Sequence, residues 1–282
     1  MLIDVLRNKL IEAAPVDEIE RDNVVQELLQ HFVLLGLSRS GFFEKAAFHG
    51  GTCLRVVNGI NRFFEDLDFM LKTPDDSFAW QEHLAAVVKD CATEGIAMEI
   101  QDRAKADTAV RKAFLKNDSV GKVLTLRSIV SKGPPRKHRI KLEIATNPPA
   151  GSAFETKYIT FPTIAPLTVQ TLDSSFALKM HALLCRQYVK GRDWFDFIWY
   201  ASRKTPVNFP LLANALRQQG QWSGQDLPVD ATWVRAALDA KIREIDWEVA
   251  RQDVQRFLPH SEQENLRFWS PELFCQLVAN VQ

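Results

Sequence analysis

Two aspartates stand two residues apart in the stretch FFEDLDFML, residues 63–71. In a β-strand alternate side chains share a face, so Asp66 and Asp68 would point one way and Leu67, Phe69 and Leu71 toward a core. Two carboxylates that close repel each other unless a cation lies between them. Mg²⁺ takes one or two carboxylates together with substrate phosphates, so the pair indicates a Mg²⁺ (or Mn²⁺) site. The alternative is a solvated edge strand whose acids pair locally.

A glycine turn precedes the aspartates, in the stretch HGGTCLR, residues 49–55. Gly50 and Gly51 can adopt positive φ and let a ligand approach closely, and Thr52 can cap the helix that follows. The start of a helix presents N–H groups and the positive end of the helix dipole, which suit a phosphate. Turn and acids together predict a bound nucleoside triphosphate, with an ordinary turn as the alternative. The Walker pattern GxxxxGK[ST] is absent from the sequence.

A third carboxylate is expected on a neighbouring strand, in HRIKLEIAT, residues 138–146. Strand alternation places Lys141 and Glu143 on one face and Ile140, Leu142 and Ile144 on the other. We predict that Glu143 is a metal ligand or the base that activates an acceptor hydroxyl. An exposed strand glutamate paired with a lysine is the other interpretation.

A second block of chemical interest is LDSSFALKMHALLCRQYVKGRDWFDFIWY, residues 172–200. Lys179 falls on an apolar helical stripe, where its ammonium needs a phosphate or must reach water along the surface. Asp193 and Asp196 share a helix face among aromatic residues, which indicates the wall of a site. Alternatively, Asp193 is a helix N-cap and Asp196 pairs with an arginine such as Arg192.

Cationic side chains near these blocks are candidates for phosphate contacts. Arg55 and Arg62 flank the glycine turn and the acids, and Arg55 could instead pair with Glu65. The run SKGPPRKHRIK, residues 131–141, is typical of a basic hairpin tip. Its functional interpretation is contact with RNA phosphates, and its alternative is a solvated hairpin. The candidate RNA contacts are Arg136, Lys137 and Arg139.

Composition restricts the class of protein. The formal net charge is +0, so no global field attracts nucleic acid or anionic membrane. No apolar stretch approaches the ~20 residues of a membrane-spanning helix. The 4 cysteines lie far apart and the 6 histidines show no zinc spacing. These features predict a cytoplasmic protein with reduced thiols and no membrane contact.

Periodicity predicts an α+β fold. Helical patterns fill about the first 45 residues, with Pro15 and Asp17 as start signals, and recur at 49–60 and 77–93. Strand patterns fall at 65–72, 95–102, 121–131, 137–146 and 155–161. From about residue 168 only helices are expected, at 168–189, 193–202, 209–219, 230–241, 246–258 and 271–281. We place the boundary near residue 165, so the predicted domains are 1–165 and 166–282.

The pattern GGTCLR…NRFFEDLDF is similar to the GGT(A/S)LR…RFSEDLDF signature of the AbiEii/AbiGii nucleotidyltransferase toxins. These toxins belong to the DNA polymerase β-like nucleotidyltransferase superfamily. The block at 168–200 resembles the lysine helix and arginine–aspartate helix of the same family. The sequence departs from it at Phe64, where members often have serine, at His49, where many have lysine, and at Glu143, where aspartate is usual.

The resemblance implies a polymerase β-like domain with a mixed sheet, followed by an all-helical half that completes the active-site cleft. It also implies Mg²⁺, a nucleoside triphosphate, toxin function with a cognate antitoxin, and in some members modification of the tRNA 3′ end. By matching position, Asp66 and Asp68 would hold the metal and Lys179 would contact triphosphate. Asp193 or Asp196 would complete the site. The phosphate-binding turn would consist of Gly50, Gly51 and Thr52.

The predicted function is therefore nucleotidyl transfer from a triphosphate to an RNA 3′ end, with release of pyrophosphate. One alternative is transfer to a small molecule or a protein, as by antibiotic adenylyltransferases. Another is a non-catalytic, nucleotide-binding partner subunit. A nuclease fits less well, because the glycine turn favours a bound triphosphate.

Overall fold

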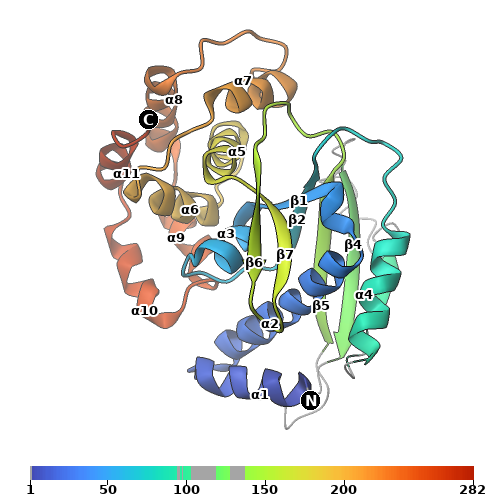
Figure 1. The fold of residues 1–282 in the computed structure, drawn as a ribbon. Helices are drawn as coiled ribbons and strands as arrows, with labels where there is room; N and C mark the ends of the chain where they lie inside the picture. The colour runs from blue at the N-terminus through green and yellow to red at the C-terminus, as the bar shows by residue number, and fades with distance from the viewer. Residues whose placement is uncertain (1, 94–95, 97, 103–118, 128–136) are drawn as a thin grey trace. The chain divides into compact units, whose positions relative to one another are not determined.

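The structure is a computed structural model that describes residues 2–93, 96, 98–102, 119–127 and 137–282 (Figure 1). The chain divides into two compact units. The sheet unit consists of residues 1–59, 63–148 and 155–169, and the helical unit of residues 60–62, 149–154 and 170–282. The predicted domains, 1–165 and 166–282, stay a prediction. None of the helices in the described part of the chain is long and apolar enough to cross a membrane.

The described strands form one mixed, seven-stranded sheet in the order β3-β4-β5-β2-β1-β7-β6. Strand β2 pairs antiparallel with β1 and parallel with β5, and β4 pairs antiparallel with both β3 and β5. Strand β7 runs parallel to β1. The bounds are β1 Ala46–His49, β2 Asp66–Leu71, β3 Met98–Asp102, β4 Ser119–Arg127, β5 Lys137–Ala145, β6 Phe154–Ile159 and β7 Ala165–Gln170. The prediction of an α+β fold with a mixed sheet is confirmed.

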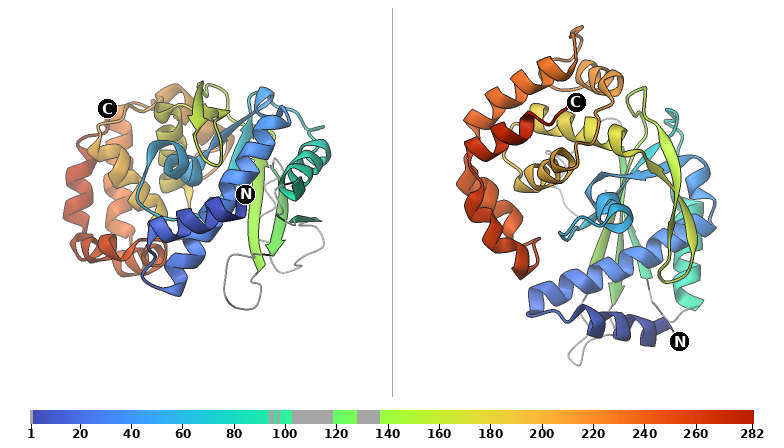
Figure 2. Two further views of the ribbon diagram at one scale, coloured as in Figure 1. Left: turned by 60° about the horizontal axis from the view of Figure 1, so that its bottom comes forward. Right: turned by 60° about the vertical axis from the view of Figure 1, so that its left-hand side comes forward.

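Two helices, α2 (Glu18–Arg39) and α4 (Gln81–Thr93), pack together along the sheet (Figures 1 and 2). They enclose a core with the apolar side chains of β1, β2 and β5, among them Phe48, Leu67, Phe69, Leu142 and Ile144. Helix α2 begins as predicted, because the Asp17 carboxylate accepts from the Glu20 N–H at 2.7 Å. The unit also contains α1 (Leu2–Ala13), a 3₁₀ turn (Phe42–Glu44) and α3 (Gly50–Asn58).

The helical unit has a core of aromatic residues. Its elements are α5 Leu172–Cys185, α6 Gly191–Ser202, α7 Phe209–Gln218, α8 Ala231–Glu244, α9 Trp247–Gln255, α10 His260–Gln263, a 3₁₀ turn at Glu264–Phe268, and α11 Pro271–Val278. Trp247 stacks on Phe274 with ring centroids 4.0 Å apart, and Trp194 meets both rings edge-on. Gly191 lets α6 approach α9 closely, since a Cβ there would lie 1.9 Å from the Ala250 carbonyl oxygen. This packing holds the start of α6 in place.

Two strands were missed from the sequence. Strand β1 has only four residues, two of them alanine, which is a poor strand former. Strand β7 runs to Gln170, so the expected end of strand structure near residue 168 is wrong, and α5 begins at Leu172. The short apolar run APLTVQ merged with the helical pattern that follows it. The remaining predicted strands and helices occur within a few residues of their expected bounds.

Candidate active site

The glycine turn lies directly against the second aspartate. Gly50 has a φ of 75°, a left-handed conformation that favours glycine. A Cβ at this position would lie 2.9 Å from Asp68 Oδ2. Helix α3 begins at Gly50, and its N-cap residue, His49, provides no side-chain cap. Backbone conformation and close approach therefore both require glycine here, as the sequence indicated.

Strand register places the candidate carboxylates on one face of the sheet. Asp66 lies opposite Lys141, and Asp68 lies opposite Glu143, on the parallel neighbour β5. Opposed residues of adjacent strands share a face, so these four side chains do so, while Leu67 points to the buried core. We call Asp66, Asp68 and Glu143 the acid face. The alternation predicted within each strand is confirmed, and the pairing of β2 with β5 places the three carboxylates on one face.

Lys141 contributes a cation to this face. Its Nζ lies 3.5 Å from Asp66 Oδ1, and the two side chains are 45% and 41% exposed. Asp66 Oδ1 is itself buried and has no hydrogen-bond partner among the described residues. Asp66 therefore pairs locally, as the alternative for the two aspartates expected, but β2 lies between β5 and β1 and is not the edge strand of that alternative.

The Thr52 hydroxyl makes a hydrogen bond to β2 and does not cap helix α3 as predicted. Its side chain is 2% exposed, and its hydroxyl donates a hydrogen bond to the backbone carbonyl oxygen of Asp66. The N-cap of α3 is His49, so the predicted capping role of Thr52 is wrong. The hydrogen bond instead fixes the start of β2 against α3. A direct contact of Thr52 with phosphate stays a prediction.

The aspartate pair fits a divalent cation of oxygen-preferring type. Both carboxylates point from one face of β2, and one buried oxygen of Asp66 lacks a hydrogen-bond partner within the described structure. Mg²⁺ needs only one or two protein carboxylates, because phosphates and water complete its shell. Among the described residues no group of three or more His, Cys, Asp or Glu is placed to hold a metal. That Glu143 is a metal ligand or the base that activates an acceptor hydroxyl stays a prediction.

Arg55 is engaged within the sheet unit. Its Nε and Nη2 each lie 3.1 Å from an oxygen of Glu27, a residue of α2, and its guanidinium lies over the Phe63 ring. This arrangement anchors α3 to α2. A contact between Arg55 and phosphate stays a prediction.

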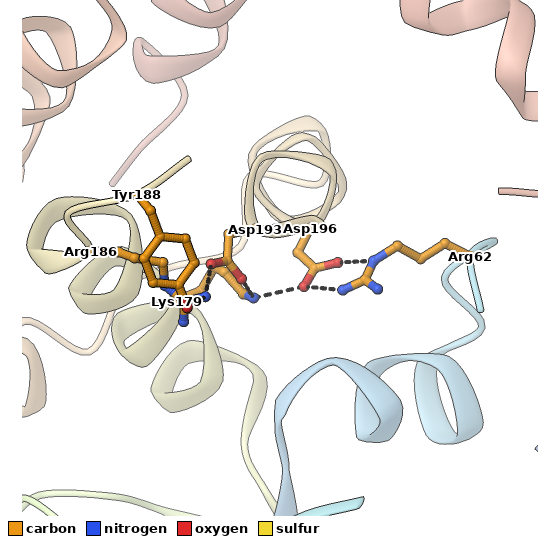
Figure 3. A network of polar contacts seen from close by, with 6 residues as sticks. All are labelled: Arg62, Lys179, Arg186, Tyr188, Asp193 and Asp196. Atoms are coloured by element: carbon orange, nitrogen blue, oxygen red, sulfur yellow. Dashed lines mark hydrogen bonds and ion pairs between the residues drawn. The ribbon is translucent and has the colours of Figure 1, made fainter. Parts of the chain in front are cut away.

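The helical unit contains a charged network, shown in Figure 3, made of Arg62, Lys179, Arg186, Asp193 and Asp196. Arg62 donates two hydrogen bonds to Asp196, at 2.7 and 2.9 Å. Lys179 Nζ lies 2.7 Å from Asp193 Oδ1 and 2.8 Å from Asp196 Oδ2. Arg186 Nη1 lies 3.3 Å from Asp193 Oδ2. The network thus joins α5, α6 and the segment 60–62.

The electrostatics of this network keep its members charged. Burial raises the pKa of Asp193 and Asp196, but adjacent cations outweigh burial, and both pKa values lie below the ordinary range. Lys179 and Arg186 act on Asp193, and Arg62 and Lys179 act on Asp196. Burial lowers the pKa of Lys179, yet the two carboxylates reverse this effect and raise it overall. Buried charges persist here because each is paired.

The contacts of residues 172–200 distinguish the alternatives given for them. Asp193 is not the N-cap of α6, because Lys190 is at that position. Asp196 does pair with an arginine, but with Arg62, while Arg192 lies over the Phe257 ring at 4.1 Å. The Lys179 ammonium is bound by two carboxylates, and its side chain is largely buried. Direct participation of Lys179, Asp193 and Asp196 in chemistry stays a prediction.

The predicted RNA contacts are only partly within the described residues. Arg136 lies outside them, as does the side chain of Lys137. Arg139 is exposed on β5, and its backbone carbonyl accepts from the Gln26 amide at 2.8 Å. The alternation that placed Lys141 on the face of Glu143 is confirmed, but the sequence did not indicate its contact with Asp66, which depends on the pairing of β2 with β5.

A glycine turn against paired aspartates on a mixed sheet is an arrangement suited to nucleotidyl transfer. Residues 33–278 match the family described as the nucleotidyl transferase AbiEii toxin of type IV toxin–antitoxin systems. The chain belongs to this family, and it is accordingly a nucleotidyltransferase of the toxin class.

Two solved structures share its fold. One is a candidate nucleotidyltransferase from H. pylori, with 18% identity and a TM-score of 0.50, covering 90% of this chain and 89% of that one. The other is JHP933 from Helicobacter pylori, with 17% identity and a TM-score of 0.51, covering 91% and 88%. No curated protein matches the sequence.

Proposed function

We propose that the protein transfers a nucleoside monophosphate from a nucleoside triphosphate to an RNA 3′ end, that of a tRNA, in a Mg²⁺-dependent reaction. The observation that carries the proposal is the acid face, where Asp66 and Asp68 share one side of β2 and Gly50 lies against Asp68. We further infer that the sheet unit is a polymerase β-like nucleotidyltransferase domain. The helical elements that follow would be its C-terminal half.

In this mechanism Asp66 and Asp68 would hold Mg²⁺, or Mn²⁺ in its place. The metal would supply positive charge that stabilises the negative charge of the reacting phosphate. Backbone N–H groups at the start of α3, around Gly50 and Gly51, bind phosphate oxygens. Thr52 keeps Asp66 in position through its hydrogen bond to the Asp66 carbonyl.

The bonds change in one displacement. The acceptor hydroxyl oxygen attacks the α-phosphorus, and the bond from that phosphorus to the bridging oxygen of the β-phosphate breaks. Pyrophosphate leaves with the bond electrons. Glu143, opposite Asp68 on β5, takes the proton of the hydroxyl.

Other predicted contacts complete the proposal. Lys179, Arg55 and Arg62 would bind phosphate, and Asp193 or Asp196 would support Lys179. Each of these residues also has a carboxylate partner in the structure, so a phosphate would be bound beside that carboxylate or in exchange for it. Arg139 would contact the RNA. A cognate antitoxin would restrain the activity.

The test uses four α-labelled nucleoside triphosphates, Mg²⁺ and total tRNA, with the wild type and Asp68→Ala. The matched control is Asp76→Asn, which alters an exposed acid of the same unit. We expect label in tRNA with the wild type and the control, and at least about a hundredfold less with Asp68→Ala. Label on a small molecule or on protein would replace the RNA acceptor in the proposal. Nucleotide binding without transfer to any acceptor would support a non-catalytic subunit.

A further inference from the structure

The lysine on the acid face is held loosely. Lys141 Nζ lies 3.5 Å from Asp66 Oδ1, and this oxygen has no hydrogen bond to any described residue. A comparable exposed strand pair, Lys157 with Glu155 on β6, is closer, at 2.8 Å. Exposed ion pairs contribute little stability, so Asp66 gains little from Lys141 and can exchange it for a stronger cation.

Two cations would interact with the same carboxylate. Asp66 is one of the two carboxylates that fit a divalent metal ion, and Lys141 is its ionic partner in the structure. A divalent ion attracts a carboxylate more strongly than an ammonium at the same distance, because its charge is doubled. Metal binding at Asp66 therefore displaces the Lys141 ammonium, which stays on the same face of the sheet beside Asp68 and Glu143.

We propose that Lys141 is a substrate-binding residue for a nucleotide phosphate, and that it occupies Asp66 only until the metal ion binds. The proposal rests on the proposed function, since the phosphate is that of the nucleoside triphosphate. A lysine is a compact cation on a flexible stem, so it can move from a carboxylate to a phosphate oxygen. Its positive charge beside Asp66 also reduces repulsion between Asp66 and Asp68.

Lys141 should therefore affect its two ligands in opposite directions. Removal of the ammonium takes a competitor and a positive charge away from the metal site, so metal binding becomes tighter. The same removal takes a cationic partner away from the phosphate, so nucleotide binding becomes weaker. If Lys141 and Asp66 form only an ordinary cross-strand ion pair, removal of the ammonium should change neither affinity. If Lys141 only orients the Asp66 carboxylate, its removal should weaken metal binding.

The experiment compares Lys141→Met with Lys157→Met, which removes a lysine of similar exposure from β6. Mn²⁺ binding without nucleotide is measured by electron paramagnetic resonance of free Mn²⁺. Nucleotide affinity is measured at saturating Mn²⁺ by equilibrium dialysis, and kcat and KM by transfer of label. Methionine keeps an unbranched apolar stem, and circular dichroism shows whether each variant is folded.

We expect Lys141→Met to bind Mn²⁺ about tenfold more tightly and nucleotide about tenfold more weakly, with KM rising more than kcat falls. Lys141→Arg should keep nucleotide affinity near wild type, and Lys157→Met should change neither quantity. Unchanged or weaker Mn²⁺ binding by Lys141→Met, or no Mn²⁺ binding by the wild type, would overturn the assignment.

The two proposals fail separately. Opposite shifts in Mn²⁺ and nucleotide affinity, with no transfer by the wild type, would keep the role of Lys141 and overturn the transferase function. Normal transfer, with Lys141→Met indistinguishable from Lys157→Met, would keep the function and overturn the role of Lys141.

Discussion

The acid face and the charged network both contain carboxylates and cations, but they differ in burial and in the distance between the paired charges. On the acid face Asp66 and Lys141 are half-exposed, and their charged atoms are 3.5 Å apart. In the network Arg62 and Asp196 are 3% and 0% exposed, and they meet at 2.7 Å. A carboxylate whose cationic partner is exposed and more distant can accept a metal ion. A buried carboxylate with close cationic partners serves first to fix the segments that it joins. Charge alone does not distinguish these roles, but burial and partner distance do.

The largest effect should come from breaking the network. Asp196→Ala leaves the buried charges of Arg62 and Lys179 without one of their partners, and we expect it to lower the free energy of unfolding of the helical unit by about 3–5 kcal/mol. Urea unfolding followed by tryptophan fluorescence measures this. Asp226→Ala is the control, since Asp226 forms an exposed pair with Arg217 and should cost less than about 1 kcal/mol. Equal losses would mean that the buried network is no stronger than a surface pair.

On the acid face, substitution should affect activity more than stability. Gly50→Ala places a Cβ 2.9 Å from Asp68 Oδ2 and displaces the carboxylate, so we expect about a hundredfold less transfer. Gly59→Ala has the same backbone strain, with φ of 73°, but meets nothing within 4 Å. Both should lose about 1–2 kcal/mol of stability, and only Gly50→Ala should lose activity. A parallel loss of activity in both would assign the defect to backbone strain rather than to Asp68.

A smaller effect is expected at Thr52. Thr52→Val removes the hydroxyl that donates to the Asp66 carbonyl, so the acceptor is left without this partner at a cost of about 1–3 kcal/mol. Transfer activity should fall with it, because the start of β2 is less firmly held. Thr52→Ser loses a buried methyl group but keeps the hydroxyl, and it should keep activity. If transfer activity falls in proportion to the free energy of unfolding in both variants, a positioning role of the Thr52 hydroxyl is rejected.

The mildest test uses pH. The low pKa values of Asp193 and Asp196 stabilise the fold fully above their unfolded values, about 3.9, and this stabilisation is lost as pH falls through the folded-state values. The raised pKa of Lys179 stabilises the fold fully below about 10.4, and this contribution is lost as pH rises through the folded-state value. The stability difference between wild type and Asp196→Ala should be flat from about pH 5 to 9 and narrow below about pH 4. A change in this stability difference with pH near neutrality would contradict this ionisation pattern.

The acid face could be predicted from the sequence because its geometry is local. Two residues of one strand share a face whatever the rest of the fold, so Asp66 and Asp68 follow from alternation alone. The same rule places Lys141 with Glu143, and only the parallel pairing of β2 with β5 had to be learned from the structure. Local rules also gave the start of α2 at Asp17 and the left-handed Gly50.

The charged network could not be predicted, because its central pair joins residues 134 apart in the chain. Sequence spacing marked Lys179, Asp193 and Asp196 as unusual on their helices but could not name Arg62 as their partner. The nearest arginine in sequence, Arg192, was the natural guess, and it packs on Phe257 instead. Burial of a charge is a property of tertiary packing, and periodicity within one helix does not specify it.

The division of the chain also limits how such a gene can be recombined. Residues 60–62 and 149–154 group with the helices, although the sequence around each of them belongs to the sheet unit. A crossover near residue 165 would bring a foreign helical half to the native Arg62, and the ion pair between Arg62 and Asp196 would form again if the donor supplied an aspartate at the position of Asp196. An exchange of residues 60–62 together with the helices that they accompany would move both sides of this ion pair as one.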